Sequence, residues 1–244
     1  MKVPQDTPTD ETIAFIEAHT KLDGRRVLEV GCGSGFLASR LAEAGALVTA
    51  IDLFEESVEA ARARGVDARV ADFLEIEEGR YDIVLFGRSL HHIHPLKDAI
   101  YRAFETVTAN GIIIADEFDI GIVDDATASW RYEVEHLLRT ANLIAGCEKE
   151  DCANAILNPL AMWNERHAKH HISTGAEMLT ALKAVFANVT MEQTAYMYRY
   201  VVDALPEEEE ANKIATTLLA WEKRMISKSS IKPVGLRFVA SAGS

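Results

Sequence analysis

Residues 27–35 read Val-Leu-Glu-Val-Gly-Cys-Gly-Ser-Gly and are the most informative stretch of the chain. The apolar, β-branched run from Arg26 to Val30 predicts a strand, and Phe36 to Ala44 predicts a helix that ends before Gly45. Three alternate glycines separate the two elements, so backbone N–H groups there can approach a ligand with no side chain in the way. The stretch therefore predicts a ligand-binding turn between a strand and a helix.

Strand and helix patterns alternate outward from this turn. We expect strands at residues 26–30, 47–51, 68–71, 81–86, 112–115 and 234–240, and a β-rich, aromatic stretch at 188–202. Helices are expected at 10–19, 36–44, 55–64, 95–108, 125–145, 152–157, 163–170, 174–187 and 206–226. The expected strands are almost wholly apolar, which indicates a parallel sheet covered on both faces. The predicted fold class is α/β, a three-layer sandwich with a seven-stranded, mostly parallel Rossmann-like sheet and a helical lid insertion.

The order of the elements also predicts how the chain is divided. Residues 1–118 are expected to form the ligand-binding core, and residues 119–172, which contain no convincing strand, a helical lid that recognises a substrate. Residues 173–244 are expected to complete the core sheet with an inserted helix, so that the whole is a single domain. The last strand is expected to be antiparallel and to lie beside the sixth.

The composition excludes several classes of protein. The 244 residues include 25 Lys and Arg against 38 Asp and Glu, so the formal net charge is −13. A field of that sign repels phosphate backbones and anionic lipids, and we expect neither nucleic acid nor a membrane as partner. Three cysteines provide no disulfide framework, and no apolar run approaches about 18 residues. We expect a cytoplasmic protein.

Acidic residues end the two expected strands that follow the glycine turn. Asp52 is placed to accept hydrogen bonds from both hydroxyls of a ribose. Asp72, followed by Phe73, is placed to accept one from an adenine amino group while the ring packs against an apolar face. A single acid suffices for the ribose of a nicotinamide dinucleotide, so the pair favours a different nucleoside ligand.

The run from Leu22 to Glu117 resembles the class I S-adenosylmethionine-dependent methyltransferases, and in particular the small-molecule group that includes quinone-biosynthesis enzymes. The stretch Leu90 to Ile93, Leu-His-His-Ile, also matches a form common in that group. The resemblance implies binding of S-adenosylmethionine and release of S-adenosylhomocysteine. It implies that the cofactor-binding residues are Glu29, Gly31, Cys32, Gly33, Gly35, Asp52, Leu53, Asp72, Phe73, Gly87 and Arg88.

The fourth expected strand departs from several other methyltransferase patterns. It ends Phe86-Gly87-Arg88-Ser89, without the Asn-Pro-Pro-Tyr or Asp-Pro-Pro-Tyr of amide and adenine enzymes and without a Pro-Cys pair. The aspartate that metal-dependent catechol enzymes place there is also missing. These departures disfavour a nucleic-acid substrate, and we expect no metal site.

Histidines are the candidate catalytic residues. An unperturbed imidazole titrates close to neutral pH, so a histidine beside the methyl donor suits a general base. Side chains alternate in an extended segment, and we expect His91 to face the site while His92 packs inward. His171, in the expected lid, is the second candidate.

The predicted function is methyl transfer from S-adenosylmethionine to an O or N atom of a small-molecule acceptor, by a monomer or homodimer. Two alternatives stay open. A catalytically silent partner protein would bind S-adenosylmethionine without turning it over, and a nicotinamide-dependent oxidoreductase would bind NADH instead. Arg88 suits either an anionic substrate group or an ion pair with a helix acid, and Cys32 is expected to be a small residue of the glycine turn.

Overall fold

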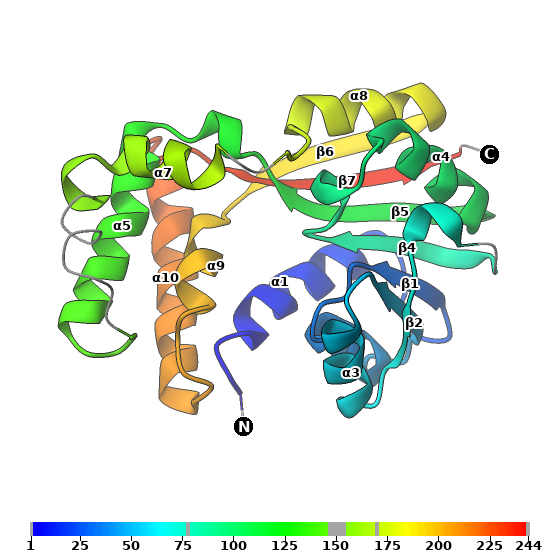
Figure 1. Cartoon of the computed structure of the whole chain (residues 1–244), viewed down its shortest axis with the longest axis horizontal. Coiled ribbons are helices and arrows are strands. Elements are labelled where there is room, and N and C mark those ends of the chain that lie inside the picture. The colour runs from blue at the N-terminus through cyan, green and yellow to red at the C-terminus, as the bar shows by residue number, and fades with distance from the viewer. Residues whose placement is uncertain (1, 77–78, 146–154, 169–170, 243–244) are drawn as a thin grey trace. The chain divides into compact units, whose positions relative to one another are not determined.

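The computed structural model describes residues 2–76, 79–145, 155–168 and 171–242. Its centre is a seven-stranded sheet in the order β3-β2-β1-β4-β5-β7-β6 (Figure 1). The strands are β1 Arg26–Val30, β2 Leu47–Asp52, β3 Asp67–Val70, β4 Tyr81–Gly87, β5 Val107–Phe118, β6 Asn188–Thr194 and β7 Gly235–Ser241. The pairs formed among β1 to β5 are all parallel. The carboxyl ends of these strands therefore meet at one edge of the sheet.

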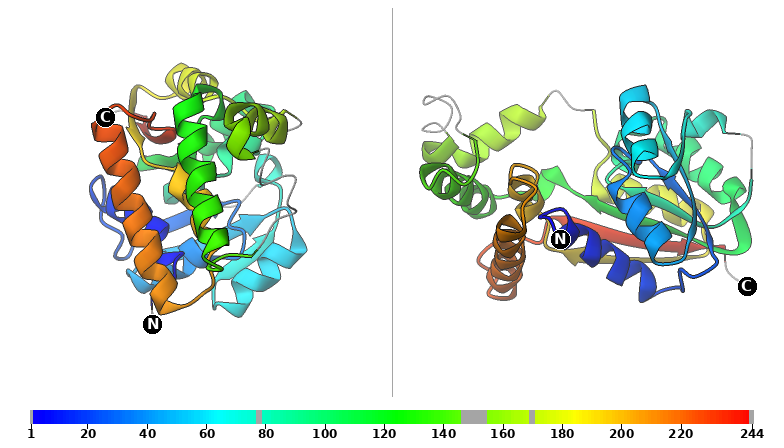
Figure 2. Two further views of the ribbon diagram at one scale, coloured as in Figure 1. Left: turned by 90° about the vertical axis from the view of Figure 1, so that its left-hand side faces the viewer. Right: turned by 90° about the horizontal axis from the view of Figure 1, so that it is seen from below.

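Helices cover both faces of the sheet, because alternate strand residues point to opposite sides. Leu28 and Phe86 pack with helices α4 (Leu96–Thr106) and α8 (Gly175–Val185) on one face. Val27 and Leu85 pack with α1 (Asp6–Glu17) and α2 (Phe36–Glu43) on the other. Helix α3 (Glu55–Ala63) packs beside α2, and the right-hand view of Figure 2 shows α1, in dark blue, lying across this face.

The last strand completes the predicted arrangement. Strand β7 lies between β5 and β6, and Figure 1 shows it running opposite to β5, toward the C-terminus. The predicted fold class, a mostly parallel seven-stranded Rossmann-like sheet between helices, is confirmed. Helix α8 begins with a capping box, in which Thr174 and Glu177 exchange hydrogen bonds.

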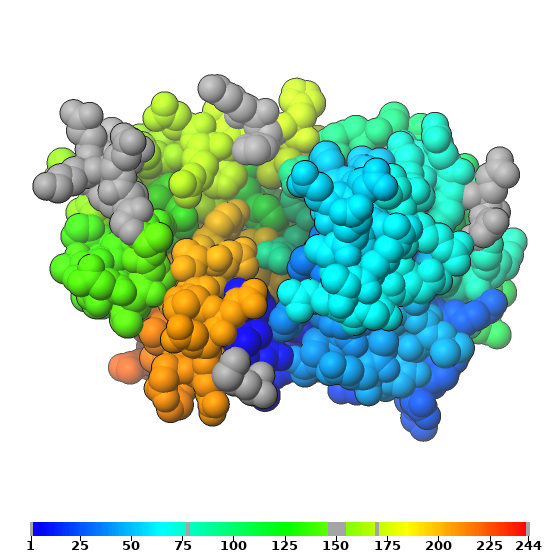
Figure 3. Space-filling view, turned by 60° about the horizontal axis from the view of Figure 1, so that its bottom comes forward, coloured from blue at the N-terminus to red at the C-terminus, as the bar shows by residue number. Residues whose placement is uncertain are grey.

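The chain separates into two compact units. The sheet unit comprises residues 11–118, 172–192 and 236–244, and the helical unit comprises residues 1–10, 119–171 and 193–235. The helical unit contains helices α5 (Asp125–Thr140), α7 (Pro159–His167), α9 (Met197–Val202) and α10 (Glu209–Ser227). In the sheet unit, the segment from β2 to β3, light blue to cyan in Figure 3, forms a continuous part of the surface.

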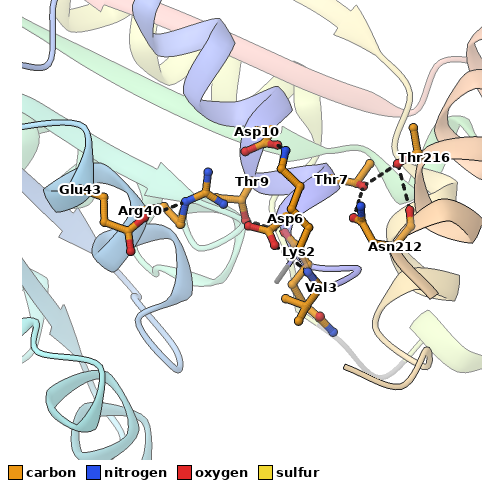
Figure 4. A network of polar contacts seen from close by, with 11 residues as sticks. Lys2, Val3, Asp6, Thr7, Thr9, Asp10, Arg40, Glu43, Asn212 and Thr216 are labelled. Atoms are coloured by element: carbon orange, nitrogen blue, oxygen red, sulfur yellow. Dashed lines mark hydrogen bonds and ion pairs between the residues drawn. The ribbon is translucent and has the colours of Figure 1, made fainter. Parts of the chain in front are cut away.

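Polar contacts hold the first residues of the chain within the helical unit. Thr7 Oγ1 donates a hydrogen bond to Asn212 Oδ1 on α10 at 3.1 Å and lies 3.3 Å from Thr216 Oγ1 (Figure 4). Nearby, the backbone N–H of Val3 donates to Asp6 Oδ2 at 2.7 Å. Residues 2–10 are thus anchored to a helix more than 200 positions away in the sequence.

The β-rich stretch predicted at residues 188–202 is wrong in its second half. Strand β6 ends at Thr194, and residues 197–202 form α9. The carboxylate of Glu222, on α10, accepts backbone N–H groups of Tyr196, Met197 and Tyr198 at 2.7 to 2.9 Å. These are the groups that a helix start leaves without partners, so a distant side chain overrides the local strand propensity.

Strand β5 is longer than the strand expected at residues 112–115 and includes Asn110 and Gly111. The strand register shifts between Tyr81, which pairs with Val107, and Ile83, which pairs with Ile112. The extra β5 residues are accommodated in this bulge, where Gly111 is required: a Cβ there would lie 2.7 Å from the Asp82 carbonyl oxygen.

No helix within the described part of the chain combines the length and apolar character needed to cross a bilayer.

Candidate functional site

A cavity of about 610 Å³ opens in the sheet unit at the carboxyl ends of β1 to β4. This is the edge at which ligands bind in parallel α/β sheets. Seven of the residues predicted to bind the cofactor line the cavity, namely Gly31, Gly33, Asp52, Leu53, Asp72, Phe73 and Arg88. The structure therefore brings together residues from the carboxyl ends of four strands, β1 to β4.

Four further residues predicted to bind the cofactor do not line this cavity: Glu29, Cys32, Gly35 and Gly87. Burial raises the pKa of the Cys32 thiol to about 12, with Glu29 and Asp52 adding repulsion, so the sulfur is an unreactive packing group. A Cβ at position 87 would lie 3.3 Å from Leu37 Cδ2, so Gly87 allows this side chain to pack closely. Cys32, Gly35 and Gly87 are therefore packing residues next to the cavity wall.

The three glycines of the turn have positive φ angles but different surroundings. A Cβ on Gly35 (φ 72°) would lie 2.6 Å from Ala61 Cβ on α3, so this glycine allows close packing of the turn on the helix. A Cβ on Gly31 would collide with Ser89 at 2.5 Å. A Cβ on Gly33 (φ 52°) would meet nothing within 4 Å and lies on the cavity wall. Gly33 is therefore the position where a ligand can approach the backbone.

The two strand-end acids are anchored by backbone N–H groups. Asp52 Oδ2 accepts the N–H of Gly33 at 2.9 Å, and its Oδ1 accepts that of Phe54 at 3.0 Å. Asp72 caps the 3₁₀ turn Phe73–Glu75 through the N–H of Leu74 at 2.8 Å. These bonds leave each carboxylate fixed in direction at the cavity wall, with lone pairs to spare for a ligand.

Glu29 is the most perturbed group of the site. Its side chain is 2% exposed, and its Oε2 has no hydrogen-bond partner among the described residues. Burial raises the pKa of this carboxyl to about 8, against the lowering effects of the Ala38 N–H group and of Arg88. A buried carboxyl with an unmatched oxygen is suited to receiving a cationic donor from a ligand.

Glu117, the last residue but one of β5, is a positioning residue that was not among those predicted from the sequence. This fully buried side chain accepts the N–H groups of Ser89 and Leu90 through Oε1, at 2.9 and 2.7 Å. Its Oε2 lies 2.5 Å from His91 Nδ1. The available signal was an acid at the end of an apolar strand, as at Asp52. Glu117 fixes the loop that follows β4.

The structure reverses the orientation expected for the histidine pair. His92 lines the cavity, whereas His91 is 2% exposed and packs edge-on against Phe118, because Glu117 draws its imidazole inward. His171 is exposed and belongs to the helical unit. Cys147, Cys152 and His170 lie outside the described residues. Across the four described ranges, no group of three His, Cys, Asp or Glu side chains could hold a metal ion.

The model of a methyltransferase domain family matches residues 28–115, which contain the glycine turn, both strand-end acids and strands β2 to β4. This match, over 88 of the 244 residues, confirms the resemblance of this region to the class I S-adenosylmethionine-dependent methyltransferases.

Curated relatives of this chain include two ubiquinone biosynthesis O-methyltransferases. The one from Bordetella avium is 33% identical over 154 residues, which cover 52% of this chain and 62% of the relative. The one from Neisseria meningitidis is 32% identical over 145 residues, which cover 48% and 60%. The chain thus spans about three fifths of the length of these relatives.

Solved structures resemble this chain over most of its length. An S-adenosylmethionine-dependent methyltransferase from Mesorhizobium loti is 17% identical, with a TM-score of 0.57 and coverage of 93% of this chain and 95% of its own. A phosphoethanolamine N-methyltransferase from Haemonchus contortus is 15% identical, with a TM-score of 0.60 and coverage of 96% and 53%. At these identities the likeness concerns the fold.

The two glycines with contrasting surroundings provide the first test. Either Gly33→Ala or Gly35→Ala places an L residue at positive φ, which costs roughly 1–2 kcal/mol. Only Gly35→Ala also collides with Ala61, so we expect it to lose roughly 1–3 kcal/mol more in urea unfolding. Gly33→Ala should instead lower the affinity for S-adenosylhomocysteine about tenfold or more, measured by calorimetry. Equal losses of stability would contradict the assigned roles.

Glu29 provides a test through pH. Its pKa is raised from 4.5 to about 8 in the folded chain, so its contribution to stability is full below pH 4.5 and is lost as the pH rises toward 8. Glu29→Gln removes this loss of stability. At about 1.4 kcal/mol per pKa unit, the loss amounts to a few kcal/mol at most. Between pH 5 and 8 the melting temperature of the variant should fall less than that of the wild type, while its affinity for S-adenosylhomocysteine drops.

The matched control for this experiment is Glu56→Gln, at an exposed position in the first turn of α3. It should follow the pH dependence of the wild type. Parallel pH profiles for Glu29→Gln and the wild type would show that Glu29 is already ionised in the folded chain at neutral pH.

Proposed function

We propose that the protein transfers a methyl group from S-adenosylmethionine to an O or N atom of a small-molecule acceptor and releases S-adenosylhomocysteine. The observation that carries the proposal is the unmatched, buried Glu29 oxygen beside the glycine turn, with open space at Gly33. A nucleoside that also bears an ammonium group is the ligand such a turn would select. The two ubiquinone O-methyltransferase relatives support a small-molecule acceptor.

The residues of the cavity fit the parts of this cofactor. Glu29 would hold the ammonium group of its amino-acid part, and Asp52, at the end of β2, the ribose hydroxyls. Asp72 would accept the adenine amino group. Phe73 is 3% exposed and packs edge-on against Phe86 at 5.4 Å, so its apolar surface is fixed where the adenine ring would lie.

The cofactor supplies, when bound, a sulfonium whose methyl group is already electrophilic. The protein therefore needs mainly to orient the acceptor for in-line attack and to exclude water. Glu117 holds the loop from Ser89 to His91 rigid at the end of β4. A hydroxyl acceptor also requires a base. His92 and His94 both line the cavity, and we take His92 as the base because it directly follows the loop that Glu117 holds, with the predicted His91 and His171 as the alternatives.

The remaining proposals concern acceptor specificity, cellular location and oligomeric state. Residues 119–172 contain the tryptophans Trp130 and Trp163, both buried, and we expect this segment to determine which acceptor is methylated. We further expect a cytoplasmic monomer or homodimer that does not act on nucleic acid.

Thermal melting with candidate cofactors tests the proposal. A ligand at about 100 times its dissociation constant adds roughly 2.7 kcal/mol to the free energy of unfolding. S-Adenosylhomocysteine should raise the melting temperature by several degrees, and NADH should leave it unchanged. The opposite result would establish the oxidoreductase alternative.

A turnover assay separates the enzyme from a catalytically silent partner protein. Labelled S-adenosylmethionine, incubated with the protein and a metabolite extract, should transfer its label to a small molecule. Binding of S-adenosylhomocysteine without any labelled product would support the silent alternative.

Paired histidine variants test the base once an acceptor is found. A general base contributes about 10²–10⁴-fold, so His92→Ala should lower kcat by that range and flatten the pH–rate profile near neutrality. His91→Ala should act differently, because it removes a buried side chain held by Glu117. We expect it to lower the melting temperature. A kcat loss confined to His91→Ala would restore His91 as the base.

A further inference from the structure

The helical unit buries an arginine whose hydrogen-bond donors are incompletely matched. Arg131, on α5, is 3% exposed, and its Nη2 lies 2.9 Å from Glu135 Oε2. Its Nε and Nη1 are both buried and have no hydrogen-bond partner in the described ranges. An unmatched buried donor is costly, so these two nitrogens require an acceptor that the described residues do not supply.

The surroundings of Arg131 carry an excess of positive charge. Glu135 also pairs with Arg139, whose Nη2 lies 2.5 Å from Oε1, so one carboxylate serves two guanidinium groups. Burial lowers the pKa of Arg131, and the charge of Arg166 lowers it further, while Glu135 opposes both. This excess occurs in a chain of net charge −13. A bound anion would balance it.

Aromatic rings surround the same guanidinium group. Its Cζ lies 4.3 Å from the ring centre of Tyr132 and 5.2 Å from that of Tyr200. Tyr200 makes edge-on contacts with Trp163 at 5.3 Å and with Tyr196 at 5.8 Å. The Tyr132 hydroxyl is also buried without a hydrogen-bond partner among the described atoms. Flat apolar surfaces beside unmatched polar groups are typical of sites for small aromatic ligands.

We propose that Arg131 binds the carboxylate of a planar aromatic acid within the helical unit. This binding is independent of the proposed function. A carboxylate provides acceptors for Nε and Nη1 and balances the charge that Glu135 leaves over. The tyrosine and tryptophan rings pack against the ring of the acid.

Binding measurements on the full chain test the site without any methyl transfer. We would titrate benzoate and 2-naphthoate by calorimetry, each against its uncharged amide, in the presence of S-adenosylhomocysteine. Each acid should bind about tenfold or more tightly than its amide. Arg131→Met should remove this preference, and Arg139→Met, which alters the other partner of Glu135, should retain it.

Further measurements keep the proposal falsifiable. If Arg131→Met fails to fold, Arg131→Lys and the comparison of acid with amide on the wild type decide the matter. Equal affinity for acid and amide, or no binding of either acid, would overturn the proposal. An S-adenosylhomocysteine titration alone reports on the proposed function, so its failure is distinct from a failure of acid binding.

Discussion

A carboxylate buried in a protein must have its oxygens matched by donors, and this constraint organises both units of the chain. Glu117 meets it with two backbone N–H groups and an imidazole, and Glu222 with three backbone N–H groups. Both side chains are fully buried. Each converts a loop into a fixed turn, since the donors it binds are those that helix starts leave without partners. Glu29 is the exception, because one of its buried oxygens is unmatched within the described residues.

The contrast between these matched carboxylates and Glu29 distinguishes buried acids that hold the fold from one that is suited to bind a ligand. The matched carboxylates of Glu117 and Glu222 are enclosed by the groups that they bind, and they stabilise the fold. Glu29 lowers the stability of the folded chain at neutral pH, because burial raises its pKa to about 8. Such a loss of stability is typical of binding sites, where the ligand supplies the missing hydrogen-bond donor. The neighbouring geometry agrees, since the Gly33 backbone faces open space and Gly35 packs directly on α3.

Short-range patterns account for the parts of the molecule that could be predicted from the sequence. Strand β1 has the predicted limits, and the strand-end acids Asp52 and Asp72 lie on the cavity wall as expected, because strand, turn and helix there follow from adjacent residues. The errors arise where a distant side chain decides. Helix α9 depends on Glu222, about 25 positions along the chain, and the orientation of His91 depends on Glu117, 26 positions away. Glu222 lies outside residues 188–202 and Glu117 lies outside residues 89–94, so the local pattern of either segment gives no information about its partner.

The unmatched groups of the two units are complementary in kind. Among the described residues, Glu29 Oε2 in the sheet unit has no donor, and Arg131 Nε and Nη1 in the helical unit have no acceptor. Each position would therefore select its ligand by charge, a cationic group at Glu29 and an anionic group at Arg131. The overall charge of −13 adds a reason for the second, because it repels anionic ligands at long range. A buried guanidinium with unmatched donors compensates locally for that repulsion. Each position would also disfavour a ligand group of the opposite charge.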